Sequence, residues 1–224
     1  MAGRLHHAGL VATAPVGRRA FEAYGRLAGL ELNFTPVRFD RAVDDPAWHV
    51  DERVTGLPSE PAGPPREGGA YAAARRVMER YEFADPARVR AVFDPDSDLE
   101  GRDLLLVGRF VGLRFRMGVR IGGVQDGDAT VSGRPVHRFR WHYRTLEGHL
   151  ERGHMDYEVR KYLDTGAVEF RIRAYSQRAA IPNPFVRLGF AVFGRATQLR
   201  FYDRSARRMR RLVADAVAGA WPDG

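Results

Sequence analysis

The chain has 224 residues, no cysteine and 44% hydrophobic residues. This length and composition can bury a sizeable core, so fibrous and wholly disordered proteins are excluded. The lack of cysteine excludes disulfide frameworks, thiolate nucleophiles and thiolate metal sites, and it suits a reducing compartment. We expect a cytoplasmic protein without a transmembrane segment, because the longest apolar stretch, 185–194, contains Arg187 and is shorter than the roughly 20 residues of a membrane span.

The formal net charge of +8 is concentrated in one segment. Residues 187–211 contain eight arginines and one acid, Asp203. Lys161 is the only lysine among 36 basic residues, and such a bias can follow from codon composition as well as from selection for phosphate binding. The charge therefore gives weak support for a nucleic-acid partner, and we do not favour one.

The first third of the chain combines helical and irregular signals. Helical spacing of apolar residues predicts helices over 15–27 and over 70–81, and a short strand is expected at 89–93. Between the helices we expect irregular structure, and the Pro- and Gly-rich residues 56–69 predict a linker or an arm extended over the surface. We expect residues 1–66 to pack as an N-terminal helix and arm on a main domain that spans 67–224.

Residues 104–176 alternate apolar and polar side chains with a period of two, which is typical of strands with one buried face. The apolar sets are Leu113, Phe115, Met117, Val119 and Ile121; Phe139, Trp141 and Tyr143; Met155, Tyr157 and Val159; and Val168, Phe170 and Ile172. Asp- and Gly-containing turns are expected at 125–128 and 164–166. Consecutive hairpins of this kind predict an antiparallel meander.

One long helix is expected from Pro184 to Ala218. Its apolar side consists of Leu199, Tyr202, Ala206, Met209, Leu212, Val213 and Ala216, and its basic side of Arg200, Arg204, Arg207, Arg208 and Arg211. The dry face of the sheet is the available partner for the apolar side. The fold class is therefore α+β, an antiparallel sheet gripped by a C-terminal helix, which is similar to the helix-grip arrangement of START-like proteins. The gap between helix and sheet is either filled by side chains or open to an apolar guest.

Residues 143–158 resemble the signature of an uncharacterised family, the domain of unknown function numbered nineteen-ninety. The similarity rests on Tyr143-Arg144-Thr145-Leu146-Glu147-Gly148-His149 and on Tyr157-Glu158, and it extends over about residues 68–212. Two positions depart from the family pattern, because Glu147 replaces a proline and Gly153-His154-Met155 replaces Gly-Glu-Glu. The resemblance implies a shared structural module and a shared hairpin, and no reaction.

The hairpin at 145–153 is the best candidate site, because it ends the sheet beside the mouth of a helix-grip cavity. The ligand-binding candidates are Phe115, Trp141, Tyr143, Thr145, His149, Phe170 and Gln198. His149 is a weak catalytic candidate whose protonation Glu147 or Asp156 would set. The alternative is structural: Gly148 and Gly153 form turns and His149 caps a loop.

We expect no metal site and no cofactor. His137, His142, His149 and His154 offer incomplete ligand sets, and His137 and His142 face opposite sides of one strand. Dinucleotide-binding and Walker-type glycine patterns are absent from the sequence.

The leading functional hypothesis is a protein that binds a small apolar or amphipathic ligand or lipid, without established catalytic activity. One alternative is a START-like enzyme of the cyclase or hydrolase type that uses His149. Another is a basic-surface binder of nucleic acid or anionic membrane through the C-terminal helix. Val186, Phe190 and Phe193 of that helix are expected to be covered by the first 66 residues.

Overall fold

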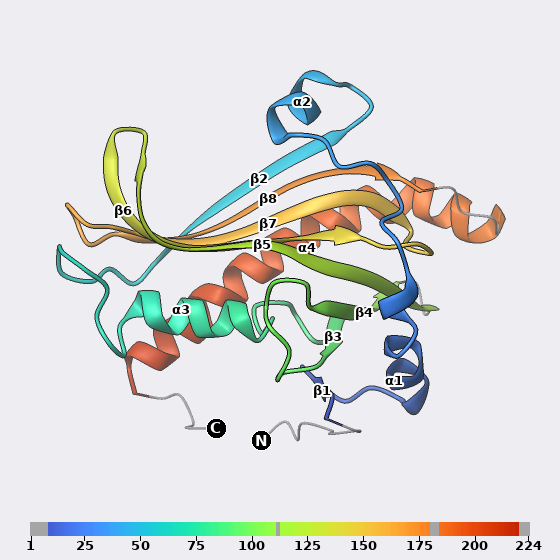
Figure 1. The fold of residues 1–224 in the computed structure, drawn as a ribbon, viewed down its shortest axis with the longest axis horizontal. Helices are drawn as coiled ribbons and strands as arrows, with labels where there is room; N and C mark the ends of the chain where they lie inside the picture. The colour runs from blue at the N-terminus through green and yellow to red at the C-terminus, as the bar shows by residue number, and fades with distance from the viewer. Residues whose placement is uncertain (1–8, 111–112, 180–183, 220–224) are drawn as a thin grey trace.

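An eight-stranded antiparallel sheet dominates the computed structural model of the protein (Figure 1). The structure describes residues 9–110, 113–179 and 184–219, and the side chains of 110, 113 and 184–194 are not described. The strands are β1 (Val11–Ala12), β2 (His49–Leu57), β3 (Val89–Phe93), β4 (Asp103–Phe110), β5 (Leu113–Val131), β6 (Arg134–Thr145), β7 (Glu151–Tyr162) and β8 (Val168–Arg178). Their order is β1-β3-β4-β5-β6-β7-β8-β2.

Among the described residues, four α-helices and one 3-10 turn accompany the sheet. They are α1 (Arg18–Tyr24), the 3-10 turn η1 (Leu27–Gly29), α2 (Phe39–Asp44), α3 (Ala70–Glu79) and α4 (Pro184–Val217). Helices α3 and α4 lie on one side of the curved sheet, and α2 lies on the other (Figure 1). The predicted α+β fold, an antiparallel meander gripped by a C-terminal helix, is confirmed. No helix among the described residues is long and apolar enough to cross a membrane.

The predicted alternation decides which face of the sheet is dry. Trp141 of β6, Tyr157 of β7 and Phe170 of β8 share the concave face and are at most 1% exposed. The arginines and histidines of the other parity lie on the convex face. At about 25 cal/mol per Å² of apolar surface removed from water, such a face drives the sheet and its covering helices together.

One of the two expected hairpin turns is wrong. The turn at 164–166 is confirmed, and Gly166 adopts a φ of +74° there. Residues 125–128 instead lie inside β5, which continues to a tight turn at Ser132 and Gly133, with φ of +49° and +77°. The polar Asp and Gly residues of this segment accompany a register shift between Gly122 and Gln125, a bulge that bends the strand without ending it.

The expected irregular conformation of the segment before the Pro-rich arm is also wrong at two places. Residues 39–44 form the short helix α2. Residues 49–57 form β2, which pairs with β8 along its whole length, from His49 opposite Ser176 to Leu57 opposite Val168. The sequence of β2 is rich in charged residues, because one of its faces carries ion pairs in place of apolar contacts. Arg53 pairs with Asp203 of α4 at 3.0 Å. Because residues of β2 bind charged partners on α4, the strand lacks the alternating apolar residues from which a strand is predicted.

Helix α3 and the residues that follow it fill much of the concave face. Phe83 packs on Tyr157 with a ring separation of 4.6 Å and on Phe170 with one of 5.5 Å, and Tyr81 reaches Trp141 at 6.3 Å. Helix α4 therefore packs mainly against α3 and β2, and its apolar side is buried there. Tyr202, Met209 and Val213 are each at most 1% exposed. Val186, Phe190 and Phe193 lie outside the side chains that the structure describes.

The Pro-rich arm is fastened by a buried ion pair. Glu60 accepts a hydrogen bond of 2.7 Å from Lys161, whose side chain is fully buried, and further bonds from the backbone N–H groups of Tyr71 and Arg66. Burial works in the opposite direction, but these hydrogen bonds hold the pKa of Glu60 below its usual value. Gly166 lies against the same residue, since a Cβ there would come within 1.8 Å of the Glu60 carbonyl oxygen.

We predict that Lys161→Met lowers the free energy of unfolding by about 3–5 kcal/mol, because it leaves the Glu60 carboxylate buried without its cation. Urea denaturation at pH 7 measures this loss. The matched control is Asp164→Asn, which removes the partner of Arg134 from an exposed pair and should cost less than about 1 kcal/mol. Equal losses in the two variants would contradict the assignment.

Candidate functional site

A pocket of about 140 Å³ lies between α4, the concave face of the sheet and the 146–151 hairpin. Its apolar wall comes from Tyr81, Leu106, Met117, Leu150, Met155 and Phe201, and its polar groups from Tyr143, His149, Glu151, Thr197 and Gln198. The pocket is therefore an apolar hollow with polar groups gathered at the hairpin end.

Glu151, the first residue of β7, gives the pocket an unusual carboxyl group. Burial raises the pKa of Glu151 to about 7, against the opposing effect of Arg195. Gln198 donates a long hydrogen bond of 3.5 Å to Glu151 and a shorter one of 2.9 Å to Ser176. Arg195 is occupied by Asp51 of β2 and by the side-chain oxygen of Gln198. Glu151 is thus poised between its two protonation states near neutral pH.

The His149 side chain contacts the backbone of its own hairpin. Its Nδ1 accepts a hydrogen bond of 2.9 Å from the backbone N–H of Glu151 and lies 3.1 Å from the carbonyl oxygen of the same residue. Burial lowers the pKa of His149 to about 4, so the ring is neutral at pH 7 and acts as an acceptor. These contacts match the structural alternative for His149 and leave a role of its Nε2 in the pocket untested.

The other predicted ligand-binding residues separate into four places. Tyr143 and Gln198 line the pocket with His149. Trp141 and Phe170 are fully buried in the aromatic core, and half-buried Phe115 lies on β5 outside the pocket lining. Thr145 fastens the hairpin, since it donates to Asn33 at 2.7 Å and accepts from the Gly153 N–H at 3.0 Å.

Tyrosine hydroxyls lie deep beside the pocket. Tyr157 donates to the Met155 sulfur at 2.8 Å, and its hydroxyl oxygen lies 3.4 Å from that of Tyr143. Burial raises the pKa of Tyr143 to about 12. The hydroxyl of Tyr202 is buried and has no hydrogen-bond partner among the described residues. Burial, and then the charge of Glu151, raise the pKa of Tyr202. Sequence reasoning missed Glu151 and Tyr202, because neither burial of a strand-end acid nor a missing partner has a sequence signal.

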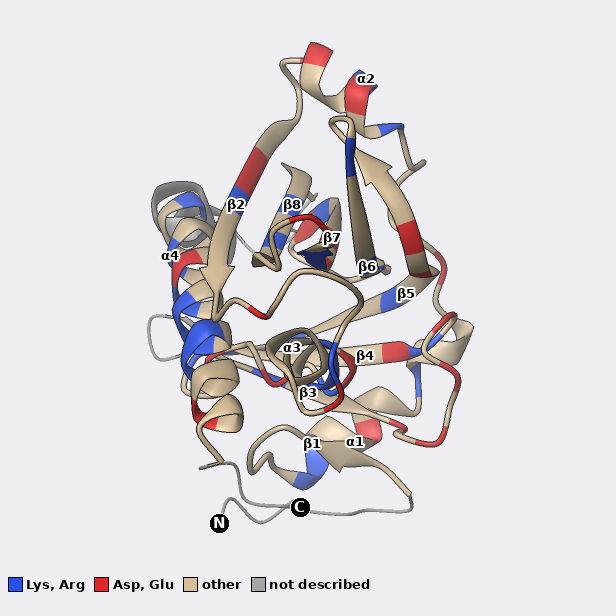
Figure 2. Ribbon diagram, turned by 90° about the vertical axis from the view of Figure 1, so that its left-hand side faces the viewer, with Lys and Arg blue, Asp and Glu red and all other residues tan. Residues whose placement is uncertain are grey.

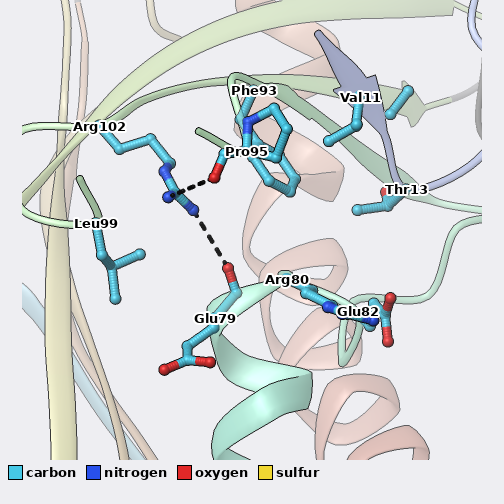
Figure 3. Close-up of a pocket in the computed structure, with 10 residues that line it drawn as sticks. Val11, Thr13, Glu79, Arg80, Glu82, Phe93, Pro95, Leu99 and Arg102 are labelled. Atoms are coloured by element: carbon cyan, nitrogen blue, oxygen red, sulfur yellow. Dashed lines mark hydrogen bonds between the residues drawn. The ribbon is translucent and has the colours of Figure 1, made fainter. Parts of the chain in front are cut away.

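A second pocket, of about 400 Å³, lies under β1 and the 93–102 loop (Figure 3). Two cations line it, Arg80 and Arg102. Arg102 donates to the carbonyl groups of Pro95 and Glu79 (Figure 3). It also donates to the Ser97 hydroxyl. The guanidinium group is therefore bound by the protein itself, and we assign no ligand to this pocket.

Four of the five arginines of the predicted basic patch lie together in the structure, and one lies apart. Arg204, Arg207, Arg208 and Arg211 line a pocket of about 470 Å³ with Asp85, whereas exposed Arg200 lies outside its lining. Basic residues follow one side of α4 (Figure 2). Arg204 donates to Asp85 at 2.9 Å and Arg208 to the Glu82 carbonyl at 2.7 Å, so half of the pocket's arginines have protein partners. Binding of nucleic acid or membrane by this patch stays a prediction.

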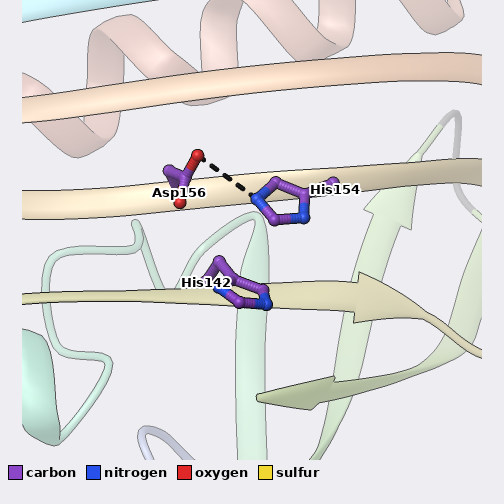
Figure 4. A group of neighbouring side chains, drawn as sticks. All are labelled: His142, His154 and Asp156. Atoms are coloured by element: carbon purple, nitrogen blue, oxygen red, sulfur yellow. Dashed lines mark ion pairs between the residues drawn. The ribbon is translucent and has the colours of Figure 1, made fainter. Parts of the chain in front are cut away.

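A group of three possible metal ligands lies on the convex face: His142, His154 and Asp156 (Figure 4). His154 Nε2 lies 3.2 Å from Asp156, which also accepts a hydrogen bond of 2.8 Å from Arg140. The expectation that Asp156 sets the protonation of His149 is wrong, because the sheet lies between the two side chains. His149 lies at the concave pocket and Asp156 on the other face.

Residues 36–208 match the family described as "Domain of unknown function (DUF1990)". The chain belongs to this family. The match begins before β2, so the matched region includes that strand as well as the meander and most of α4. No curated protein matches the chain.

Solved structures also resemble this family member. Ara h 8.0201 is 10% identical with a TM-score of 0.42, and the match covers 75% of this chain and 99% of the other. Norcoclaurine synthase from Thalictrum flavum, in complex with dopamine and hydroxybenzaldehyde, is 8% identical with a TM-score of 0.42, covering 83% and 96%. An uncharacterised protein from Rhizobium leguminosarum is 8% identical with a TM-score of 0.35, covering 75% and 97%.

We predict that Glu151→Gln stabilises the protein at pH 8 and has little effect at pH 4. A carboxyl group whose pKa is raised on folding contributes stability below its unfolded pKa, and this contribution is lost as the pH rises towards 7. Glutamine does not titrate and escapes the loss. We expect a gain of about 1–2 kcal/mol at pH 8, less than the full pKa shift implies, since Glu151 is partly exposed.

Thermal unfolding of both proteins from pH 4 to pH 8 measures this difference. Glu147→Gln, which changes an exposed carboxylate of the same hairpin, is the control. Parallel stability curves for the wild type and Glu151→Gln would contradict the raised pKa.

Proposed function

We propose that the protein binds a small aromatic or amphipathic molecule in the pocket between α4 and the sheet. The observation that carries this proposal is the pairing of an apolar wall with a carboxyl group whose pKa is about 7 and an amide, Gln198, at one end. Concave, mostly apolar sites with a few placed polar groups are typical of small-molecule binding.

The volume of the pocket limits the guest. An engineered apolar cavity of about 150 Å³ in another protein holds one benzene molecule. The pocket here, of about 140 Å³, therefore suits a single ring with one polar substituent. A long-chain lipid would need Tyr81, Phe201 or Met117 to move. We accordingly narrow the predicted ligand from apolar molecules and lipids to ring-sized compounds.

The polar end favours a guest with a hydrogen-bonding group. When Glu151 is protonated it offers a donor, and when it is ionised it offers acceptors. The Tyr202 hydroxyl, which has no hydrogen-bond partner in the described part of the chain and whose pKa is raised by burial and by the charge of Glu151, is buried behind the pocket lining. A purely apolar guest would leave these polar groups without hydrogen-bond partners, at a cost of about 1–3 kcal/mol per buried group.

Phenol provides a direct test. We expect saturable shifts of pocket resonances in NMR titrations of the wild type, with millimolar or tighter affinity. Thr197→Leu fills the pocket from α4 and should weaken binding at least about tenfold, a change of about 1.4 kcal/mol. Thr197→Ser keeps the space and is the matched control. Absence of saturation, or equal binding to the Leu variant, would contradict the proposal.

Acid–base catalysis on the bound guest is a second candidate, favoured by one observation. The pKa of about 7 suits Glu151 for proton transfer at neutral pH, whereas the pKa of His149 at about 4 and its bond to the hairpin backbone do not. In this proposal Glu151 replaces His149 as the acid or base of the enzyme alternative.

For any turnover of a ring-sized substrate, we expect the rate to change with an apparent pKa near 7 and Glu151→Gln to abolish that dependence. Rate measurements from pH 5 to pH 9 test this. His149→Ala is the comparison variant, and loss of the pH dependence in that variant alone would return the catalytic role to His149.

A further inference from the structure

The convex face of the sheet carries a pocket that the proposed function does not use. It has a volume of about 400 Å³ and lies between residues 36–39 and strands β5, β6 and β7. Its polar lining consists of Arg38, Gln125, Arg140, His142, Arg144, His154 and Asp156. The sheet separates this pocket from the concave one.

Positive charge exceeds negative charge in the pocket. Arg140 is paired with Asp156, the only acid in the lining, at 2.8 Å. Arg38 reaches out to Asp40 on α2 at 3.0 Å. Arg144 is half-buried on β6 between these groups, and its Nε is buried without a hydrogen-bond partner among the described residues. A guanidinium N–H that is removed from water without a hydrogen-bond partner costs free energy, and an anion that accepts from it would offset this cost.

One nitrogen on each of two imidazole rings also lacks a partner among the described residues. His142 Nε2 and His154 Nδ1 are also buried without hydrogen bonds in the part of the chain that the structure describes. Burial, then His154 and Arg144, lower the pKa of His142 to about 4. Asp156 and Arg140 act on the ring in opposite directions. His142 is therefore neutral at pH 7.

The geometry is poor for a metal ion, although His142, His154 and Asp156 include three ligand atoms within 4.8 Å of one another. The two imidazole rings are stacked, with centroids 4.4 Å apart and planes inclined by 23°. A metal must lie in the plane of each imidazole that binds it, and nearly parallel planes do not meet at one nearby point. Arg140 and Arg144 would in addition repel a divalent cation.

Aromatic side chains form the remaining wall of the pocket. Tyr175 stacks on His154 with a ring separation of 5.1 Å and an angle of 8°, and its hydroxyl donates to the Val37 carbonyl at 2.9 Å. Phe39 packs edge-on against Tyr175 at 5.8 Å. An anion bound at Arg144 would thus have apolar surface beside it, and the pocket volume exceeds that of a single inorganic ion.

We propose that the convex pocket binds a phosphate group, held by Arg144 and Gln125 with the stacked imidazoles beside it. Arginine suits this group because its planar fork of N–H donors matches two phosphate oxygens. Gln125 reaches the pocket because the bulge between Gly122 and Gln125 places it opposite Arg140. The organic part of a phosphate monoester would lie against Phe39 and Tyr175. This site is independent of the concave pocket and of its proposed function.

Titration of the full-length protein with inorganic phosphate, phenyl phosphate and acetate at low salt tests the proposal. We expect saturable binding of both phosphates by calorimetry, tighter for phenyl phosphate if the natural ligand is a monoester, and weaker binding of acetate. Arg144→Gln should weaken phosphate binding at least about tenfold. Arg138→Gln is the matched control, because it removes the same charge from the same face of β6 outside the pocket, and should change the affinity less than about twofold.

Two further measurements guard against a folding defect in Arg144→Gln. Gln125→Ala changes an exposed residue and should weaken phosphate binding without altering the melting temperature. NMR titration of the wild type should show the pKa of His142 rising when phosphate is present, since an anion stabilises the imidazolium ion. A merely structural pocket would not produce this change.

Three outcomes would overturn the proposal. The first is failure of the wild type to bind either phosphate at about 10 mM, a concentration at which even weak charge-assisted sites fill. The second is an equal loss of phosphate affinity in Arg138→Gln and Arg144→Gln, which would indicate non-specific attraction to a basic face. The third is tight zinc binding that His154→Ala abolishes, together with no phosphate binding, which would indicate a metal site.

Discussion

The alternation of side chains along β5 to β8 is the constraint on which both candidate sites depend. Met155 and His154 are adjacent in the chain, yet Met155 lines the concave pocket and His154 the convex one. A shift of register by one residue would exchange them. The bulge between Gly122 and Gln125 is the place where β5 departs from strict pairing with β6, and it brings Gln125 beside Arg140. Both pockets therefore depend on correct pairing of the same strands.

The concave pocket is small because α3 and the residues that follow it cover much of the concave face of the sheet. Tyr81 adopts a φ of +55°, a left-handed conformation that is uncommon for a residue other than glycine. This backbone turn directs the chain so that Phe83 packs on Tyr157 and Phe170. The aromatic core closes the middle of the sheet, and space remains only at the 146–151 hairpin. The helix-grip gap is thus neither fully packed nor widely open.

The sequence predicted the elements whose residues alternate or repeat regularly. The meander, α3 and α4 were all expected, because their burial is periodic. The prediction from sequence was wrong at β2, whose inward residues Asp51 and Arg53 bind α4 through ion pairs. It was also wrong at 125–128, where residues typical of turns lie in a bulged strand. The candidate site was only partly predictable. Tyr143 and Gln198 were found from position, but the raised pKa of Glu151 depends on burial by residues distant in sequence.

The N-terminal segment connects the two candidate sites physically. Asn33 donates to the Glu151 carbonyl at 2.9 Å and accepts from Thr145, and the Glu147 N–H donates to the Glu31 carbonyl at 3.0 Å. A few residues later the same segment forms the outer wall of the convex pocket at 36–39. The segment that the sequence presented as irregular therefore contacts the hairpin that positions Glu151 and also forms a wall of the convex pocket, so both sites depend on how this segment packs.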